Sequence, residues 1–388
     1  MAGFEVIGAE ELQEIQEVFD SGAVLFRHSF EALRNGCFKV QEFEQSFANY
    51  MGTKHALAVS SGTAALRVAL AALDIGPGDE VITQSFTFVA TVEAIVESGA
   101  TPICAEIDDS LNLDPNDLEQ LITPKTKAVI VVHMLGVPAN LPRIIEICER
   151  SNIRLIEDTA WGCGGRLNGK ALGTWGDIGA FSFDFAKTMT TGEGGMLTFQ
   201  SSRDFEKAAA WHDHGHENNP SVPRWEDTRS SSGFNFRMME LQGAVGLAQL
   251  KKLSDIVSCQ RRNRDLIWDS IKDLELITLR SSPDGTFDTA DALIFFVRNN
   301  KLALKCREEL LNVGMSTKIL PEAYSWHFAG TWHHIKELRA SHGGDLTRSF
   351  QKSAEKLSRA VSIPVGVKME AEVPQTIRLA LTRALSSQ

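Results

Sequence analysis

The sequence predicts an α/β protein in which a large, mostly parallel sheet is followed by a smaller C-terminal α/β domain. Between residues 55 and 199, short apolar runs alternate with helical stretches, and glycine, proline or aspartate marks each switch. The 388 residues exceed the size at which a single hydrophobic core usually stops growing. A second alternation of helix and strand patterns follows a strongly helical segment. We therefore expect two domains, residues 1–254 and residues 255–388.

The elements of the first domain follow one another in βαβ order. Strands are expected at Ala56–Val59, Glu80–Thr83, Thr101–Glu106, Ala128–Val132, Arg154–Glu157 and Ala180–Phe183. Helices with apolar residues three and four positions apart are expected at Thr63–Leu73, Phe88–Ser98, Pro115–Leu121 and Leu141–Ser151. This alternation predicts a parallel sheet with helices on both faces, and ligands of such sheets bind beyond the carboxyl ends of the strands.

A polar stretch without periodicity, residues 216–233, predicts a long loop before the second domain. A helix is expected from Glu240 to about Leu274. After it come the strand Leu293–Val297, the helix Lys301–Val313, the strand Met315–Ile319, the helix Leu346–Ser358 and a terminal helix from about Ala371. These elements predict the smaller α/β domain.

Composition excludes several classes of partner and location. Acidic residues outnumber basic ones by 50 to 39, and the resulting charge of −11 disfavours nucleic acid or an anionic membrane as the main partner. Six scattered cysteines without a C-x-x-C pair favour reduced thiols over a disulfide framework or a zinc knuckle. Residues 1–20 carry five glutamates where a signal peptide needs an apolar core, and no apolar run is long enough to span a bilayer. We therefore expect a cytoplasmic protein.

A hydroxyl- and glycine-rich turn, Ser60-Ser-Gly-Thr-Ala-Ala-Leu66, joins a predicted strand to a predicted helix. Ser61, Gly62 and Thr63 offer hydroxyls and unhindered N–H groups at the helix N-terminus, which is a favourable place for a phosphate. The same residues also suit a simple helix cap. Only the neighbouring groups in the fold decide between these interpretations.

Two charged residues lie at the ends of later strands. Asp158 ends the strand that begins at Ile153, and Lys187 follows the strand near Phe183. An aspartate here can simply cap a turn, and a lysine at a strand end is usually a solvated surface residue. Lys187, however, follows three phenylalanines and precedes the glycine-rich turn Gly192-Glu-Gly-Gly195, so we expect an apolar pocket closely approached by backbone.

Together, a phosphate cradle, a strand-end acid and a desolvated lysine are the groups that a pyridoxal phosphate enzyme needs. Lys187 forms the Schiff base and shuttles protons once its pKa is lowered by burial. Asp158 keeps the pyridine nitrogen protonated, which makes the ring an electron sink. Phe88, in Ser85-Phe-Thr-Phe-Val-Ala90, is expected to stack on the ring.

The chain resembles the sugar aminotransferases of the DegT/DnrJ/StrS type, which have the aspartate-aminotransferase fold (fold type I). The resemblance extends over nearly the whole chain. It rests on the Ser-Gly-Thr-Ala-Ala-Leu turn, Gly76-Pro-Gly-Asp-Glu80, Glu157-Asp158, Lys187 with Thr191-Gly-Glu-Gly-Gly195, and Gly233-Phe-Asn-Phe-Arg237. It implies pyridoxal 5′-phosphate as cofactor, glutamate as amino donor and a keto sugar as acceptor.

The resemblance also implies individual roles. Lys187 and Asp158 are the catalytic pair, and Gly62, Thr63 and Ser182 are phosphate contacts beside the stacking Phe88. Asn235 resembles the asparagine that reaches the phosphate of the neighbouring subunit, which implies a homodimer with shared active sites.

Two positions depart from the family pattern. Where relatives have a glutamine or histidine near the phenolic oxygen of the cofactor, this chain has Trp161, which we expect to stack or to shape the substrate pocket. Asp184 stands where relatives often have a histidine, and the residues alone offer no physical account of that change.

A looser similarity concerns the substrate. Gly3-Phe-Glu5, Asp213-His-Gly-His216 and Trp326-His-Phe328 with the following Trp332-His-His-Ile-Lys-Glu337 resemble a subgroup that aminates carbon 8 of a 3-deoxy-octulosonate for lipopolysaccharide. His327 is the expected substrate residue, and Lys318, Arg229 or Arg237 is expected to bind the sugar carboxylate. A nucleotide-linked 3- or 4-keto-hexose is the rival substrate.

Other functions are weaker alternatives. His212-Asp-His214-Gly-His216 has histidines at alternate positions, but no cluster of ligands with metal spacing accompanies it, so we expect a polar loop and no metal. In related sugar dehydratases the Schiff-base position is histidine, so Lys187 favours transamination. A non-catalytic binding protein would not need this lysine and acid, and Gly162-Cys-Gly-Gly165 lacks the third glycine of a nicotinamide-binding fingerprint.

Overall fold

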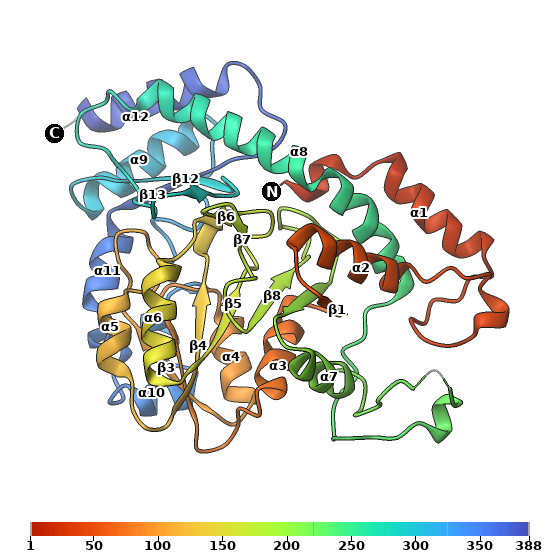
Figure 1. The fold of residues 1–388 in the computed structure, drawn as a ribbon. Helices are drawn as coiled ribbons and strands as arrows, with labels where there is room; N and C mark the ends of the chain where they lie inside the picture. Colours follow the sequence, from red (N-terminus) through yellow and green to blue (C-terminus); the bar gives the residue numbers. More distant parts are fainter. Residues whose placement is uncertain (1, 220, 324, 387–388) are drawn as a thin grey trace.

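The computed structural model describes residues 2–219, 221–323 and 325–386. Within these ranges, seven strands form the main sheet in the order β1-β9-β8-β5-β4-β2-β3. The strands are β1 (His55–Val59), β2 (Glu80–Gln84), β3 (Thr101–Ala105), β4 (Thr126–Val132), β5 (Arg154–Asp158), β8 (Ile178–Ser182) and β9 (Gly195–Phe199). Only β9 runs against the others, since it pairs antiparallel with both β1 and β8. The large, mostly parallel sheet is therefore confirmed (Figure 1).

Helices cover both faces of this sheet. One face packs against α3 (Gly62–Ala72), α4 (Val89–Glu97) and α7 (Ser202–Trp211); the other packs against α2 (Lys39–Met51), α5 (Pro115–Leu121), α6 (Leu141–Ser151) and the start of α8 (Glu240–Ile271). In β4, the side chain of Ile130 packs in the core on the face covered by α3, α4 and α7. The side chains of Val129 and Val131 pack in the core on the face covered by α5 and α6. Apolar side chains alternate between two buried faces, which explains why the strands are almost continuously hydrophobic.

The smaller domain is built on the antiparallel sheet β10-β12-β13. Its elements are β10 (Thr278–Leu279), β12 (Ala292–Phe296), α9 (Asn300–Asn312), β13 (Ala360–Pro364) and α12 (Val373–Ser386). We call this unit the small domain. Its core also includes Ile267 and Ile271 from the end of α8. The expected domain boundary at residues 254 and 255 falls inside α8 and stays a prediction.

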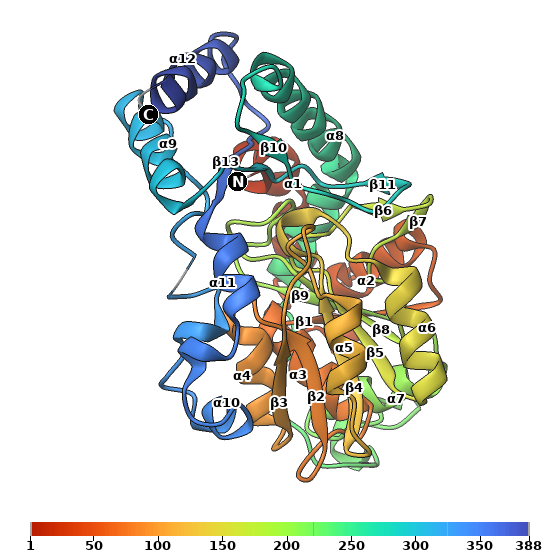
Figure 2. The same ribbon diagram turned by 90° about the vertical axis from the view of Figure 1, so that its left-hand side faces the viewer.

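The two parts of the chain are tied together at several places. The helices α10 (Lys336–Ser341) and α11 (Gln351–Ser358) lie along the β3 edge of the main sheet, as Figure 2 shows. A third sheet, made of three short strands, joins β6 (Arg166–Leu167) and β7 (Lys170–Ala171) to β11 (Thr286–Phe287). The helix α1 (Ala9–Asp20) packs along α8 (Figure 1). The 3-10 helices are η1 (Gly3–Val6), η2 (Glu31–Leu33), η3 (Met134–Gly136), η4 (Arg224–Glu226), η5 (Ala329–Thr331) and η6 (Leu346–Arg348).

The second domain contains the main errors of the sequence predictions. The strand expected at Met315–Ile319 is wrong, because these residues form no strand and Ile319 has a left-handed φ of 74° that ends any extended run. The expected helix Leu346–Ser358 is divided into η6 and α11, since Phe350 turns out of helical geometry. Two strands were not predicted, β13 in the small domain and β9 in the main sheet. The long loop at 216–233 is confirmed for its described residues, apart from η4; residue 220 lies outside them.

Candidate active site

A cavity of about 290 Å³ lies where the parallel strands end, and we call it the strand-end cavity. Eight of the sequence-predicted site residues line it: Gly62, Thr63, Phe88, Asp158, Trp161, Ser182, Lys187 and His327. They come from five separate loops of the chain. Lys318, Arg229 and Asn235 are not among the described residues that line the cavity. The carboxyl ends of the strands therefore assemble most of the expected site.

The turn from β1 into α3 forms one wall. The Ser61 hydroxyl accepts a hydrogen bond from the N–H of Ala64 and caps the helix. The first N–H groups of a helix have no partner within it, so Gly62 and Thr63 present donors to the cavity. A Cβ added at Gly62 would lie 2.7 Å from the Cβ of Ser182, so only glycine lets the helix start and the end of β8 approach this closely. This arrangement is well suited to a phosphate.

Asp158 ends β5 and is 5% exposed. Its Oδ2 accepts a hydrogen bond from the Thr91 hydroxyl at 2.8 Å, and its Oδ1 accepts one from the N–H of Ala160 at 3.2 Å. Burial raises the pKa of Asp158, and the two hydrogen bonds together with the charge of Lys187 oppose that rise. A carboxylate fixed in this way can hold a proton on a ligand nitrogen.

Thr91 is a site residue that the sequence argument missed. It is buried in the first turn of α4, and its hydroxyl also lies 2.8 Å from that of Thr87. The available signal was the spacing of the two threonines, four residues apart at a predicted helix start. Thr91 fixes the orientation of the Asp158 carboxylate, because its only hydroxyl proton is donated there.

The adjacent Glu157 stabilises the same strand end from the other face. Its carboxylate accepts N–H groups from Gly173, Trp175 and Gly176 and lies 3.0 Å from the imidazole of His133. Both Glu157 and His133 are fully buried. This network ties the loop after β7 to β5, so the backbone that bears Asp158 is held in place.

Lys187 lies in the loop that follows β8. The side chain of Asp184 accepts a hydrogen bond from the N–H of Ala186, and the N–H of Lys187 donates to the carbonyl of Asp184. Asp184 therefore closes the turn that presents the lysine, which supplies the missing physical account of this position. On the other side, the N–H of Gly3 donates to the Lys187 carbonyl at 3.1 Å, and Phe4 stacks on Phe185 at 4.7 Å.

The Lys187 ammonium has an apolar and aromatic environment. Its Nζ lies 3.6 Å from the centroid of the Trp161 ring. Burial lowers the pKa of Lys187 to about 8, while Asp158 and Asp291 favour its charged form and Lys318 disfavours it. An amine with such a pKa is partly neutral near physiological pH, so it can act as a nucleophile and as a base.

Phe88 and His327 form the outer wall. Phe88 is 41% exposed, and its ring centroid lies 5.4 Å from that of His327 and 6.1 Å from that of Trp326. Backbone N–H groups of Thr87 and Val89 donate to the carbonyls of His327 and Trp326. Burial lowers the pKa of His327 to about 4, and the charges of Lys187 and Lys318 act in the same direction. His327 is therefore a neutral imidazole at physiological pH.

Two of the three cations expected to bind a carboxylate form ion pairs within the chain. Lys318 forms an ion pair with Asp291, and Arg237 forms one with Asp213. Arg229 is exposed and bridges through its backbone to His216.

His216 itself pairs with Asp227 at 3.1 Å, and in the described part of the chain no group of histidine, cysteine, aspartate or glutamate is arranged to hold a metal ion.

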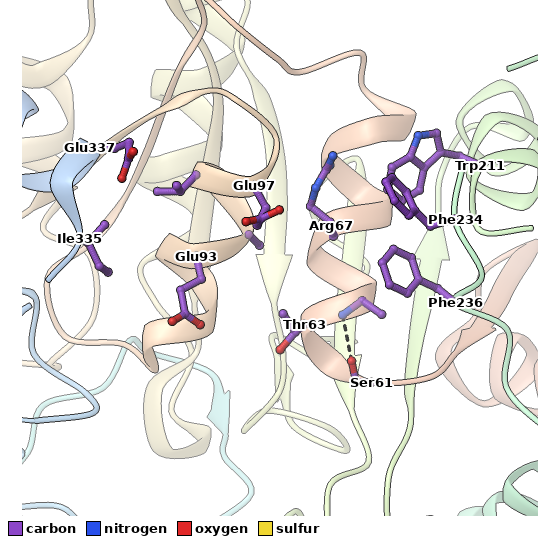
Figure 3. Close-up of a pocket in the computed structure, with 13 residues that line it drawn as sticks. Ser61, Thr63, Arg67, Glu93, Glu97, Trp211, Phe234, Phe236, Ile335 and Glu337 are labelled. Atoms are coloured by element: carbon purple, nitrogen blue, oxygen red, sulfur yellow. Dashed lines mark hydrogen bonds between the residues drawn. The ribbon is translucent and has the colours of Figure 1, made fainter. Parts of the chain in front are cut away.

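A second cavity, of about 570 Å³, lies on the other side of the α3 N-terminus, and we call it the Arg67 cavity (Figure 3). It shares Ser61 and Thr63 with the strand-end cavity. The Arg67 guanidinium lies 4.9 Å from the Trp211 ring, and Phe234 and Phe236 lie on the same side of Arg67 as Trp211. The exposed Asn235 lies between these two phenylalanines, on a loop that does not line the strand-end cavity of its own chain.

The strand-end cavity fits pyridoxal phosphate in three respects. It has a helix N-terminus with a glycine whose Cβ would collide with Ser182, a buried carboxylate, and a lysine whose pKa is lowered by burial. These would hold the phosphate, the ring nitrogen and the reactive aldehyde carbon, respectively. The residues of the strand-end cavity thus match the chemistry of the cofactor at its phosphate and at its ring.

Comparison with known proteins places this site among aminotransferases. SpsC, a spore coat polysaccharide biosynthesis protein of Bacillus subtilis, is 40% identical over 272 residues, which are 67% of this chain and 65% of that protein. A GDP-perosamine synthase of Caulobacter vibrioides is 42% identical over 224 residues, 58% of this chain and 59% of that protein. The chain thus matches less than two thirds of the length of either relative.

A solved aminotransferase structure from Psychrobacter cryohalolentis has a TM-score of 0.86 and 26% identity, covering 98% of this chain and 97% of that one. The DegT/DnrJ/EryC1/StrS aminotransferase family matches residues 6–382. The resemblance seen in the motifs and the fold class is therefore confirmed. The chain belongs to the DegT/DnrJ/EryC1/StrS aminotransferase family, and its cofactor is pyridoxal 5′-phosphate.

Proposed function

We propose that this protein is a sugar aminotransferase, which moves an amino group from glutamate to a keto or aldehydo sugar used in cell-surface polysaccharide. The observation that carries the proposal is the single cavity that unites Lys187, Asp158 and the Gly62–Ser182 cradle. SpsC, which by its name acts in spore coat polysaccharide biosynthesis, supports the sugar pathway. The presence of a lysine at position 187 favours transamination over dehydration.

The proposed chemistry assigns one task to each residue. When bound, the cofactor supplies an electron sink for the carbon that loses or gains a proton. Lys187, with its pKa near 8, takes that proton from one substrate and returns it to the other. Asp158, oriented by Thr91, stabilises the protonated ring nitrogen. Trp161 and Phe88 supply apolar surfaces that exclude water from the amine.

The charge pattern bears on the choice of sugar. An 8-oxo-3,8-dideoxy-octulosonate, whose amination would yield the 8-amino sugar of lipopolysaccharide, needs a cation for its carboxylate. Lys318 and Arg237 are already paired with Asp291 and Asp213. This pairing engages two of the three candidate cations. The similarity to a GDP-perosamine synthase supports a nucleotide-linked 3- or 4-keto-hexose. His327, as a neutral imidazole in the outer wall, is suited to hydrogen-bond a sugar hydroxyl in either case.

A homodimer with shared active sites is part of the proposal. Asn235 is exposed beside the Arg67 cavity, and Phe234 next to it is 58% exposed. Aromatic residues, phenylalanine included, are enriched at protein–protein interfaces. Asn235 of one subunit would then complete the phosphate cradle of the other. Arg229, on the same loop, would lie at this interface and approach the substrate of the partner.

We also propose that the protein acts in the cytoplasm, where its six free cysteines would stay reduced. Among the described residues, no helix is both long and apolar enough to cross a membrane. The excess of 11 negative charges gives no support for attachment to an anionic lipid surface.

One experiment tests activity and substrate together. The pyridoxamine form of the enzyme is mixed separately with an 8-oxo octulosonate and with GDP- or UDP-linked keto-hexoses, and regeneration of the aldehyde cofactor is followed by absorbance. We expect regeneration with a nucleotide-linked keto-hexose. Regeneration by the octulosonate alone would overturn the substrate assignment, and no regeneration by any keto sugar would overturn the activity.

The attachment point and the shared site need their own measurements. Borohydride reduction followed by peptide mass spectrometry should locate the cofactor on Lys187, and a covalent adduct in Lys187→Ala would contradict this assignment. Mixing Asn235→Ala subunits with Lys187→Ala subunits should restore part of the activity, because one of the two mixed sites has both residues intact. Absence of complementation at every mixing ratio would argue against shared sites.

A further inference from the structure

Asp291 and Lys318, from the small domain and its flanking loops, act on Lys187 but have no part in the proposed reaction. The Trp161 ring contacts two ammonium groups, with Nζ of Lys187 at 3.6 Å and Nζ of Lys318 at 4.8 Å from its centroid. Lys318 in turn forms an ion pair with Asp291. One aromatic ring therefore lies close to the reactive lysine and to a second lysine whose charge is balanced by a carboxylate.

The Asp291–Lys318 pair is anchored on a single strand of the small domain. The N–H of Lys318 donates to the carbonyl of Ser362 in β13, and the N–H of Val365, just after β13, donates to the carbonyl of Asp291. Asp291 is 1% exposed, and its Oδ1 has no hydrogen-bond partner among the described residues. A buried carboxylate is costly without a cation, so the ion pair with Lys318 stabilises Asp291 at this place.

The same segment of the small domain also holds Trp161. The hydroxyl of Thr289, two residues before Asp291, donates to the Trp161 carbonyl at 3.1 Å. The N–H of Thr289 donates to the carbonyl of Gly136 in the large domain. Thr289 thus contacts the backbone of Trp161, and Asp291 contacts the side chain of Lys318.

We propose that Trp161, Asp291 and Lys318 form a positioning unit through which the small domain sets the orientation and the charge of Lys187. This inference rests on the proposed function, since it concerns the lysine that performs the proton transfers. The positioning unit uses a tryptophan where the family pattern has a glutamine or histidine, so its action is aromatic and electrostatic.

The three members act on Lys187 in different directions. The indole face stabilises the ammonium form by a cation–π contact. The negative charge of Asp291 stabilises it further, whereas the positive charge of Lys318 opposes it. Among the described residues, Asp158, Asp184 and His327 also interact with Lys187, and Glu193 lines the same cavity. Because Asp291 and Lys318 oppose each other, removing one of them should shift the titration of Lys187 and removing both should restore it.

The first test is a double-mutant cycle on the full-length apoenzyme. The rate at which a limiting amine reagent modifies Lys187 is measured against pH by peptide mass spectrometry, and the midpoint gives the pKa of the lysine. We expect Lys318→Met to raise the midpoint by about one pH unit and Asp291→Asn to lower it by about as much. The double variant should return close to the wild-type midpoint. Unchanged midpoints in the single variants, or shifts of the same sign, would overturn the positioning unit.

The second test concerns the ring and does not depend on the stability of the ion-pair variants. Trp161→Leu keeps an apolar side chain but removes the aromatic face, so the midpoint of Lys187 should fall by about 0.5–1 pH unit. Trp161→Phe keeps a face and should recover at least half of this shift. Equal midpoints for all three proteins would refute a role for the indole.

Failure of this inference is distinguishable from failure of the proposed function. If the wild-type enzyme attaches its cofactor at Lys187 and aminates a keto sugar, but the variants leave the lysine titration unchanged, only the positioning unit is wrong. If the wild-type cofactor is attached elsewhere, the proposed function itself fails.

Discussion

The strand-end cavity and the Arg67 cavity share the first turn of α3 but differ in what lies opposite it. In the strand-end cavity, Ser61 and Thr63 face a buried carboxylate and a lysine delivered by the ends of β5 and β8. In the Arg67 cavity, the same turn faces a guanidinium that lies over an indole, and Glu93, Glu97 and Glu337 line the opposite side of the cavity (Figure 3). The second cavity is the larger of the two.

The two cavities show that neither the volume of a cavity nor the presence of charged side chains in it identifies a reactive site. Arg67 keeps its proton at any ordinary pH, although burial lowers its pKa, and its glutamate neighbours stand on exposed helix faces. Lys187 can lose its proton near pH 8, and Asp158 is oriented by two hydrogen bonds. Groups that are desolvated and fixed at strand ends can change protonation state during a reaction.

Among substitutions in the two cavities, replacement of Lys187 should lower activity most. We expect Lys187→Ala to lower kcat by about 10³-fold or more, because both the nucleophile and the proton carrier are lost. Single-turnover measurements with the pyridoxamine form separate the loss of proton transfer from the loss of cofactor binding. Residual activity within ten-fold of wild type would mean that another group carries the proton.

Removal of the charge at Asp158 should have the next largest effect. Asp158→Asn keeps the shape but cannot stabilise a protonated ring nitrogen, so kcat should fall by about 10²-fold or more. Thr91→Val removes only the hydrogen bond that orients the carboxylate and should cost about ten-fold or less. Measured kcat values in the reverse order would show that Thr91 does more than orient Asp158.

A methyl group at Gly62 should weaken cofactor binding without touching the reacting atoms. The added Cβ of Gly62→Ala would lie 2.7 Å from the Ser182 Cβ, so the phosphate cradle must widen. Overpacking of this kind should raise the Kd for pyridoxal phosphate by about ten-fold. Gly76→Ala is a matched control, because its φ is not in the left-handed region and the atom nearest to the added Cβ, the Ser98 carbonyl oxygen, lies at an ordinary contact distance of 3.6 Å. Fluorescence titration of the two apoenzymes compares their affinities.

Substitution in the Arg67 cavity should have the smallest effect on catalysis. Arg67→Ala removes the stacking on Trp211 and should lower the free energy of unfolding by about 1 kcal/mol. The value of kcat/KM for the keto sugar should change by less than about two-fold. A larger change in kcat/KM at unchanged stability would show that the Arg67 cavity, like the strand-end cavity, takes part in the reaction.

The positions of Asp158 and Lys187 could be predicted because parallel strands present their carboxyl ends at one edge. β13 was harder to detect, since its short run, Ala360–Pro364, contains a serine and ends in a proline. The assigned role of each site residue stays a prediction. The pairing of Lys318 with Asp291, and of Thr91 with Asp158, could not be predicted, because these contacts join segments that only the tertiary fold brings together.

The N-terminal segment bears on the timing of assembly during synthesis. Glu5 accepts N–H groups from Val367 and Lys368, and Gly3 donates to the Lys187 loop. At translation rates of roughly 5–20 residues per second, the residues that bind Glu5 emerge roughly 20–70 s after it. The segment that supports the loop of the reactive lysine is therefore fixed only after residues 367 and 368 have been made. Nascent chains released before that point would lack these contacts of Glu5.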